Sequence, residues 1–415
     1  MLELSDRISS AEFAQLARHP DHPRAFTRSR QLPLPALIGA LLSMRNQSQQ
    51  ATLDGFFTSL CGTPSLQRCV SDRAFAKARD HLHLPALSSL NDLVVQRADS
   101  SGLIQRWCGL RVVAADASVL MPAVRPCLLQ RSAAAGDQRL FSLYLPGAEL
   151  TLHASVHGAA VSERAMLMEA LSALGPDDVL VLDRGYPAAW LVALLNARGI
   201  RFVMRCDSRS GWAASKRFVR SDLLEQQVLL NAPSRKDVAD WACPADAPEV
   251  RLIRQVASNG QVRVLATNLD ASTFPHELFS DLYHQRWRIE EAFKRLKHRM
   301  HLEAVSGLSQ QALIIDVAAK VLSDNLTSLM CQVAEVTQKM AACASGHKRK
   351  CNRAYAATVM QRILPRCLLL IGNWDQTILD ALRLMGSTFQ RFVPNRSRPR
   401  PARHVKPHPS GAYKG

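Results

Sequence analysis

The sequence has no hydrophobic run that approaches the roughly 20 residues that a helix needs to span a bilayer. The longest candidate near the start, residues 34–42, is too short and does not have the layout of a secretory signal. We therefore expect no membrane-spanning segment, no membrane partner and a cytoplasmic location.

Closely spaced cysteine pairs are also missing. None of the ten cysteines forms a C-x-x-C pair, the spacing that is typical of zinc sites and thiol redox motifs. In a chain without a secretory signal, scattered cysteines indicate reduced and mostly buried thiols. A structural zinc site is the weaker alternative.

Acidic residues are scarce relative to basic ones. The chain has 35 Asp and Glu against 52 Lys and Arg, with a formal net charge of +17 and a pI near 9.9. Such an excess is large for an enzyme of small neutral metabolites and indicates a polyanionic partner such as nucleic acid. The 415 residues, of which 47% are hydrophobic, are enough for two or three packed domains.

Both ends of the chain are predicted to be helical. In residues 1–105, Pro35 opens a periodic apolar run, and Ser71 can cap a second helix. Residues 346–390 form a second helical region, and residues 391–415 form a basic tail with several prolines and no acid. We expect this tail to be disordered in isolation, where it either lies on nucleic acid or is only a solvated segment.

Between these ends, short apolar runs alternate with helical patterns, which indicates an α/β fold class with a mixed sheet. Residues 106–205 form the first part of this core, with predicted strands at 110–116, 139–145, 149–156, 178–183 and 201–205. Residues 206–275 read as a β-rich insertion, because alternating runs flank Asn259-Gly260, a strong hairpin signal. Residues 276–345 return to the core with a helix that carries Glu290 and a long helix after it.

Three acidic residues stand out by their context. Asp116 and Asp183 each end an apolar strand, where a lone carboxylate is unfavourable unless it binds something. Adjacent strands with acids at the same end, and a helix with Glu290 packed across them, would bring the three together. Each acid also has an ordinary explanation, since Asp116 and Asp183 can cap turns and Glu290 can pair with a base on its own helix.

The stretch from Tyr283 to Lys297 places Glu290 among basic residues. At 3.6 residues per turn, one continuous helix would project Tyr283, Arg286, Glu290 and Lys297 from a single face. Arg286 and Lys297 would hold phosphate oxygens, the first as a two-pronged donor and the second as a point charge. The stretch therefore indicates phosphodiester chemistry.

Three gathered carboxylates form an oxygen-rich site of the kind that Mg²⁺ prefers, with Mn²⁺ as the expected substitute. Without cations or protons the carboxylates would repel one another. Two ions about 3.5–4 Å apart would flank one phosphate, one activating the attacking hydroxyl and the other stabilising the leaving oxygen. We therefore predict that Asp116, Asp183 and Glu290 are catalytic residues and metal ligands.

The order of these motifs resembles a known family. The pattern D…D-R-G-Y…Y-x2-R-x3-E-x6-K is similar to that of the DDE-type transposases of bacterial insertion sequences, in the insertion-sequence-four group with its Tyr-Arg-Glu-Lys signature. Tyr283, Arg286, Glu290 and Lys297 match that signature, and residues 183–186 match the motif of the second aspartate. The resemblance covers roughly residues 25 to 330.

One position departs from the family pattern. Asp116-Ala117-Ser118 stands where the family more often has Asp-Gly-Thr or Asp-Gly-Ser, so the metal ligand is kept and its neighbour is changed. The family position implies that Asp116 is the first of the three metal-binding acids.

The resemblance implies a ribonuclease-H-like core with a β-rich insertion, and an N-terminal helical region that binds the terminal inverted repeats of the element. It also implies a homodimer that cuts and joins double-stranded DNA with Mg²⁺ in a bacterial cell, associated with the nucleoid when bound to DNA. Tyr283, Arg286 and Lys297 would position the phosphates. Trp212 or Trp241 of the insertion would either stack on a flipped base, as in some relatives, or pack in the core.

Two other functions remain open from the sequence. The first is a ribonuclease-H-like DNA nuclease or resolvase that cuts without strand transfer. The second is a non-catalytic DNA-binding derivative of a transposase, although the presence of all three acids argues against it.

Overall fold

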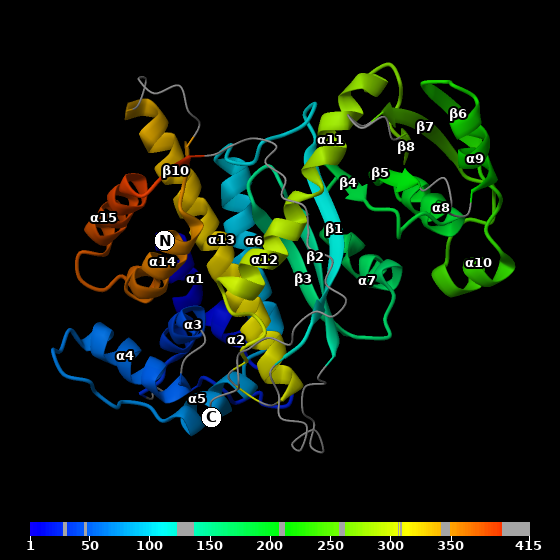
Figure 1. Ribbon diagram of the computed structural model, residues 1–415. Coiled ribbons are helices and arrows are strands. Elements are labelled where there is room, and N and C mark those ends of the chain that lie inside the picture. Colours follow the sequence, from blue (N-terminus) through cyan, green and yellow to red (C-terminus); the bar gives the residue numbers. More distant parts are fainter. Residues whose placement is uncertain are drawn as a thin grey trace. The chain divides into compact units, whose positions relative to one another are not determined.

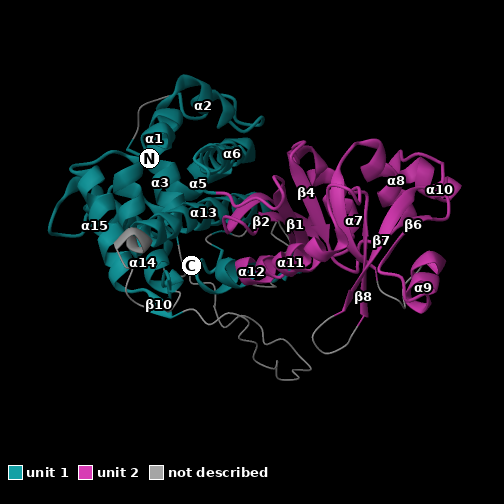
Figure 2. Cartoon of the chain, turned by 90° about the horizontal axis from the view of Figure 1, so that it is seen from above, with its two compact units in different colours: residues 1–103, 119–139, 293–415 teal, residues 104–118, 140–292 magenta. Residues whose placement is uncertain are grey.

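The computed structural model describes residues 1–27, 31–44, 48–122, 137–206, 212–256, 262–305, 307, 309–341 and 349–391. The chain divides into two compact units that are each built from separate segments (Figure 2). Unit 1 comprises residues 1–103, 119–139 and 293–415, and unit 2 comprises residues 104–118 and 140–292. The predicted basic tail, apart from Arg391, lies outside the described residues.

Unit 1 is helical in its described part, with one short β-ribbon (Figure 1). Its helices are α1 (Leu2–Ser9), α2 (Ala11–Leu16), α3 (Leu34–Ser43), α4 (Gln49–Cys61), α5 (Asp72–Asp80), α6 (Leu84–Ser100), α13 (Gln310–Ala341), α14 (Arg353–Leu368) and α15 (Trp374–Ser387). The ribbon pairs β9 (Arg349–Lys350) with β10 (Gln390–Arg391).

Local signals explain where the unit 1 helices begin. Proline stands in the first turn of α3, and the Ser71 hydroxyl accepts a hydrogen bond from the backbone N–H of Ala74 at the start of α5. Apolar side chains of α3, α6, α13 and α14 then form one buried cluster. The helical ends predicted from the sequence are therefore confirmed.

Polar groups buried along α13 have partners from other helices. Arg79 of α5 forms an ion pair with Asp316 at 3.3 Å, and both side chains are almost fully buried. Asn325 donates to Asn91 of α6 at 2.7 Å. Such pairing removes the penalty of burying lone polar groups and specifies how α13 is seated within this unit.

Unit 2 is organised around one sheet of eight strands in the order β3-β2-β1-β4-β5-β8-β7-β6 (Figure 1). The strands are β1 (Arg111–Leu120), β2 (Gln138–Leu145), β3 (Leu150–Gly158), β4 (Asp178–Leu182), β5 (Arg201–Cys206), β6 (Glu225–Leu229), β7 (Glu249–Val256) and β8 (Val262–Thr267). β1 pairs with β4, and β4 with β5, in parallel. β8, β7 and β6 extend the sheet beyond β5 through antiparallel pairings. β4, which lies between β1 and β5, is buried throughout, as expected for a strand covered on both faces.

The predicted hairpin of residues 250–266 is confirmed by the antiparallel pairing of β7 with β8, whereas its turn lies outside the described residues. These strands continue the same sheet through the pairing of β8 with β5. The boundaries of the β-rich insertion and of the other predicted domains stay predictions.

The helices of unit 2 connect the strands. They are α7 (Glu163–Ala170), α8 (Ala189–Ala197), α9 (Ala213–Arg220), α10 (Arg235–Trp241), α11 (Phe279–Gln285) and α12 (Arg288–His298), with 3₁₀ turns at Leu171–Ala173 and His276–Leu278. The last residues of α12 belong to unit 1. The mixed α/β fold class, with helical regions at both ends, is confirmed.

The prediction of one continuous helix from Tyr283 to Lys297 is wrong. α11 ends at Gln285 and α12 begins at Arg288. At the junction the N–H of Arg286 donates to the Tyr283 carbonyl and that of Glu290 to the Trp287 carbonyl, each three residues back. Such 3₁₀-type turns advance by three residues, so a constant 3.6-residue period does not hold through the junction.

None of the helices in the described ranges has the length and apolar character that crossing a membrane requires.

Candidate active site

Asp183 directly follows β4, and Asp116 lies within the neighbouring parallel strand β1, which continues to Leu120 instead of ending at Asp116 as the sequence predicted. The β1–β4 pairing places Ala114 opposite Val181, and continuing that register by two residues places Asp116 opposite Asp183. Side chains alternate along a strand, so both acids point to the same face as Val112 and Val181. That face carries the apolar cluster that includes residues of α11.

Asp116 is the more strongly perturbed of these two acids. Its side chain is 19% exposed, and its Oδ1 accepts a hydrogen bond from the Ala117 N–H at 2.9 Å. Burial raises the pKa of the Asp116 carboxyl to about 7; the Arg286 guanidinium opposes this rise, and the carboxylates of Asp183 and Glu163 add to it. Burial therefore disfavours the ionised form of Asp116, and a bound cation would favour it.

Arg286 connects the strand acids to α12. Its Nη1 lies 3.6 Å from Oδ2 of Asp116, and its Nη2 lies 3.7 Å from Oε1 of Glu290. The buried Nε of Arg286 has no hydrogen-bond partner within the described part of the chain. Asp116, Asp183, Arg286 and Glu290 all belong to unit 2, so the structure gathers these predicted site residues within one unit.

Tyr283 packs beside the same face of the sheet. It is buried among apolar residues that include Phe279 and Val203. Burial raises the pKa of the Tyr283 hydroxyl, against the effect of Arg286 and Arg205. The phenol is therefore a neutral hydrogen-bonding group next to Arg286 rather than a charged one.

Lys297 has contacts of a different kind. It belongs to unit 1, where its Nζ donates to the Val119 carbonyl and lies 3.5 Å from Oε1 of Glu303. The phosphate role predicted for Lys297 stays a prediction.

Three residues near the acids were not predicted as site residues. The β4–β5 pairing places Leu182 opposite Met204, so Arg205 follows in the position opposite Asp183. Glu163 at the start of α7 and Tyr186 after β4 both act electrostatically on this cluster. The only sequence signal for Arg205 is its alternation with Val203, which places both side chains on one face of β5. That alternation does not reveal which strand lies next to β5.

The carboxylate oxygens of Asp116, Asp183 and Glu290 are chemically suited to bind a hard divalent cation. Carboxylate oxygens are the preferred ligands of Mg²⁺, and burial, the main cause of the raised pKa of Asp116, disfavours an ionised carboxylate that has no bound cation. Arg286 is the counter-ion that Asp116 and Glu290 share in this arrangement. Among the described residues, no three His, Cys, Asp or Glu side chains are placed so as to coordinate one ion together.

Residues 130–326 match the family model of the transposase DDE domain. The matched segment contains Asp183 and Glu290, and Asp116 precedes it. The chain is also 21% identical over 301 residues to the transposase InsG for insertion sequence element IS4 of Escherichia coli (strain K12), across 70% of this chain and 67% of that protein. The two comparisons support a DDE transposase of this kind, and DDE domains generally use divalent metal ions.

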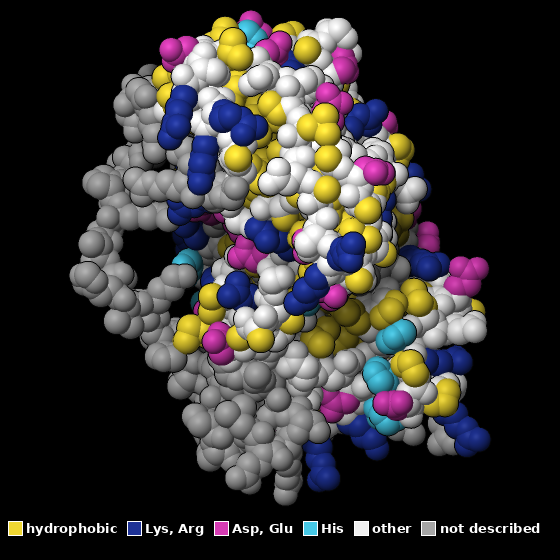
Figure 3. Space-filling view, turned by 90° about the vertical axis from the view of Figure 1, so that its right-hand side faces the viewer, with side chains coloured by type: hydrophobic (Ala, Val, Ile, Leu, Met, Phe, Trp, Pro, Cys, Tyr) yellow, Lys and Arg dark blue, Asp and Glu magenta, His cyan; other side chains and the backbone are white. Residues whose placement is uncertain are grey.

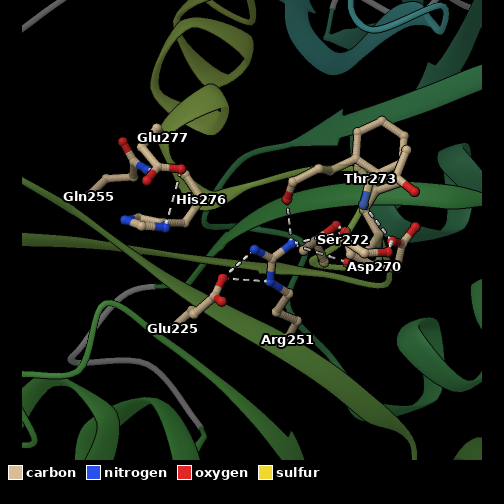
Figure 4. Close-up of polar contacts among 11 residues, drawn as sticks. Glu225, Arg251, Gln255, Asp270, Ser272, Thr273, His276 and Glu277 are labelled. Carbon is tan, nitrogen blue, oxygen red and sulfur yellow. Dashed lines mark hydrogen bonds and ion pairs between the residues drawn. The ribbon is translucent and has the colours of Figure 1, made fainter.

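A buried arginine anchors the loop that leads into α11 of unit 2. Arg251 of β7 is 3% exposed and donates from Nε to Oε2 of Glu225 at 3.0 Å (Figure 4). Its Nη1 donates to the carbonyls of Asp270 at 3.2 Å and Phe274 at 2.7 Å. The guanidinium carbon also lies 5.5 Å from the ring centre of Phe279, the first residue of α11. Arg251 thus ties β6 and β7 to the segment that carries Tyr283 and Arg286.

The two tryptophans of the predicted insertion differ in their surroundings. Trp241 stacks on Trp190 of α8, with ring centres 4.3 Å apart and planes inclined by 4°. Trp212 directly precedes α9 and is partly exposed. Packing therefore accounts for Trp241, and a base-stacking role of either residue stays a prediction.

Asp116→Asn is expected to stabilise the protein strongly at pH 8 and much less at pH 4. The unfolded carboxyl ionises near the ordinary pKa of 3.8 and the folded one near about 7, so between these values the folded state binds more protons. A rise in pH through this window therefore destabilises the unchanged protein, by up to roughly 4 kcal/mol at about 1.4 kcal/mol per pK unit, and the variant escapes this loss. Denaturant unfolding at both pH values without divalent cations measures the difference. A variant with the same pH dependence as the unchanged protein would contradict the burial of an ionisable Asp116.

Proposed function

We propose that the protein is a transposase that cleaves DNA at the ends of an insertion sequence and joins the freed 3′ ends to target DNA by a cut-and-paste route. The observation that carries this proposal is the pair of Asp116 and Asp183 at matching positions of adjacent parallel strands, with Arg286 between Asp116 and Glu290. The match to the transposase DDE domain over residues 130–326 supports it independently.

Each residue has a proposed task. Asp116, Asp183 and Glu290 hold Mg²⁺, or Mn²⁺ in its place, as two ions when DNA is bound. Bound divalent cations would supply Lewis-acid stabilisation of the phosphate and a more acidic attacking group. Arg286 exchanges its carboxylate partners for phosphate oxygens, as its unpartnered Nε in the described structure favours.

Tyr283 and Lys297 are the other two proposed phosphate-binding residues. The neutral Tyr283 hydroxyl beside Arg286 donates to a phosphate oxygen, and Lys297 adds a point charge. The helical region of residues 1–105 binds the terminal inverted repeats, and two copies of the chain pair the two ends.

A precut DNA end separates this function from that of a nuclease that cannot join. A duplex with a free 3′ hydroxyl at the element end, a supercoiled target and Mg²⁺ are incubated with the purified protein. Covalent joining of the end to the target is the expected product. Hydrolysis of the DNA without joining would contradict a transposase, and a reaction that proceeds equally in excess chelator would contradict the cation site.

DNA affinity is expected to fall steeply with salt. The formal charge is +17, and each Lys or Arg contact to phosphate releases a counterion, with a slope of about −0.9 in log affinity against log salt per contact. On the face drawn in Figure 3 the Lys and Arg side chains are interspersed with acidic and uncharged ones. Binding titrations across a salt series on specific and scrambled duplexes measure the slope, and a slope near zero would contradict binding through the phosphate backbone.

A further inference from the structure

The turn that follows Asp183 brings a further acid to the site. The backbone N–H of Gly185 donates to Oδ1 of Asp183 at 2.7 Å. A methyl group in place of the Gly185 hydrogen would lie 3.1 Å from that oxygen and 3.7 Å from Oε2 of Glu163. The carboxylates of Asp183 and Glu163 therefore border the same small space above Gly185.

The start of α7 is tied to this turn from its own side. The Ser162 hydroxyl caps the helix by accepting from the Ala165 N–H, which fixes Glu163 in the first turn. The next residue, Arg164, donates from Nε to the Tyr186 carbonyl and from Nη2 to the Pro187 carbonyl, each at 3.1 Å. Glu163 is thus held beside the strand end by its neighbours in the chain.

Besides Asp183, Glu163 has Asp116 and the Tyr186 hydroxyl within its electrostatic range. An acid in a first helical turn is also ordinary, because it interacts well with the helix dipole. That interaction does not require Glu163 to lie near Asp183 and Asp116.

A second observation points to a ligand. Tyr186 is 0% exposed, and its hydroxyl has no hydrogen-bond partner within the described residues. The same hydroxyl lies in the field of Glu163, Asp116, Asp183 and Arg286. Buried hydroxyls are normally paired, so this one has the capacity to donate to a group that enters the cluster.

We propose that Glu163 is a fourth acidic residue of the divalent-cation site, acting with Asp183 across Gly185, and that the Tyr186 hydroxyl donates to a carboxylate or water that faces the ion. This inference rests on the proposed function, because it takes the cation site of Asp116, Asp183 and Glu290 as its starting point. It adds a ligand from α7 and a hydrogen-bond donor from the turn after β4. Residues that orient metal ligands typically change metal affinity by 10- to 100-fold when removed.

Mn²⁺ affinity of the full chain without DNA tests the proposal, measured by calorimetry or by the paramagnetic signal of free Mn²⁺. Glu163→Gln is expected to bind Mn²⁺ about ten-fold or more weakly. The matched control is Glu169→Gln on the same helix, because Glu169 is 68% exposed and faces His157 instead. This control is expected to bind like the unchanged protein.

Tyr186→Phe is the second variant, and it separates a cation role from a merely structural one. Removing an unpartnered hydroxyl is expected to leave the unfolding temperature without Mn²⁺ unchanged or higher, while Mn²⁺ affinity falls. Tyr144→Phe, at an equally buried tyrosine of β2, controls for the loss of any core hydroxyl and is expected to keep Mn²⁺ affinity.

The outcomes distinguish this inference from the proposed function. If the unchanged protein binds Mn²⁺ and both Glu163→Gln and Tyr186→Phe bind it equally well, only the fourth acid and its donor are overturned. If Tyr186→Phe lowers the unfolding temperature and leaves Mn²⁺ affinity intact, the donor role is overturned. If the unchanged protein binds no Mn²⁺ at all, the cation site and this inference fall together.

Discussion

Asp183→Asn is expected to abolish Mg²⁺-dependent strand cleavage while DNA binding survives. The change removes one negative charge from the end of β4, and loss of a single electrostatic group at the reacting centre typically lowers the rate by about 10²–10³-fold. The fold should survive, because the asparagine oxygen still accepts from the Gly185 N–H that Asp183 binds at 2.7 Å. Single-turnover cleavage of a labelled end duplex measures the rate, and a gel-shift titration measures binding.

Glu290→Gln extends this test to α12 and has a control beside it. Glu290 shares Arg286 with Asp116, so its charge is expected to be as necessary as that of Asp183. Glu291→Gln alters the next, exposed position of α12 and should retain cleavage. Full Mg²⁺-dependent cutting by purified Asp183→Asn or Glu290→Gln would refute the assignment of the acids.

Arg251→Met is expected to lower the free energy of unfolding by about 3 kcal/mol, the lower end for breaking a buried ion pair. Arg251 is 3% exposed, and its loss leaves the carbonyls of Asp270 and Phe274 without their donor (Figure 4). The lower end applies because the Glu225 side chain is 38% exposed, so water can solvate its carboxylate once Arg251 is removed. Chemical denaturation measures the loss, and cleavage should decline as well because the loop leads into α11.

A surface pair of the same unit serves as control for this prediction. Arg106 pairs with Asp177 at 3.9 Å, and Asp177 is largely exposed. Arg106→Met should therefore change stability by less than about 1 kcal/mol. Equal destabilisation by both substitutions would mean that the buried position of Arg251 has no special role in anchoring the loop.

The strand acids were predictable because buried strands obey a simple period. Apolar runs that end at Asp116 and Asp183 indicated both strands and the end of β4, whereas β1 continues past Asp116 to Leu120. Side-chain alternation then determined the face. The sequence also predicted the hairpin of β7 and β8 from its turn residues. In these segments local pattern and tertiary packing favour the same structure.

The junction between α11 and α12 was not predictable from the same reasoning. The helical pattern continues without a proline or glycine from Tyr283 to Lys297, so nothing local marks the change to 3₁₀-type turns. Burial of Tyr283 in the apolar cluster on the sheet accompanies that change. Packing against the sheet is a tertiary property that a single helix pattern does not contain.

The neighbours of the acids were missed for a related reason. Arg205 lies opposite Asp183 only because β5 pairs with β4, and strand order is not encoded within either strand. Glu163 reads as a common helix-start acid and Tyr186 as part of a turn. In the sequence, Arg251 occupies a polar position of an alternating strand, which predicts an exposed side chain. In the structure it is buried and donates hydrogen bonds to carbonyls of the loop before α11.

Cleavage and joining by the purified protein test the central claim most directly. The substrates are a duplex that carries the inverted repeats flanking the coding region, a target plasmid, and either Mg²⁺ or a chelator. We predict cation-dependent release of the 3′ hydroxyl followed by its attachment to the plasmid, and neither product in the chelator. No cleavage at the repeats in any divalent cation, from protein that is folded and binds the duplex, would contradict a catalytic centre built from Asp116, Asp183 and Glu290.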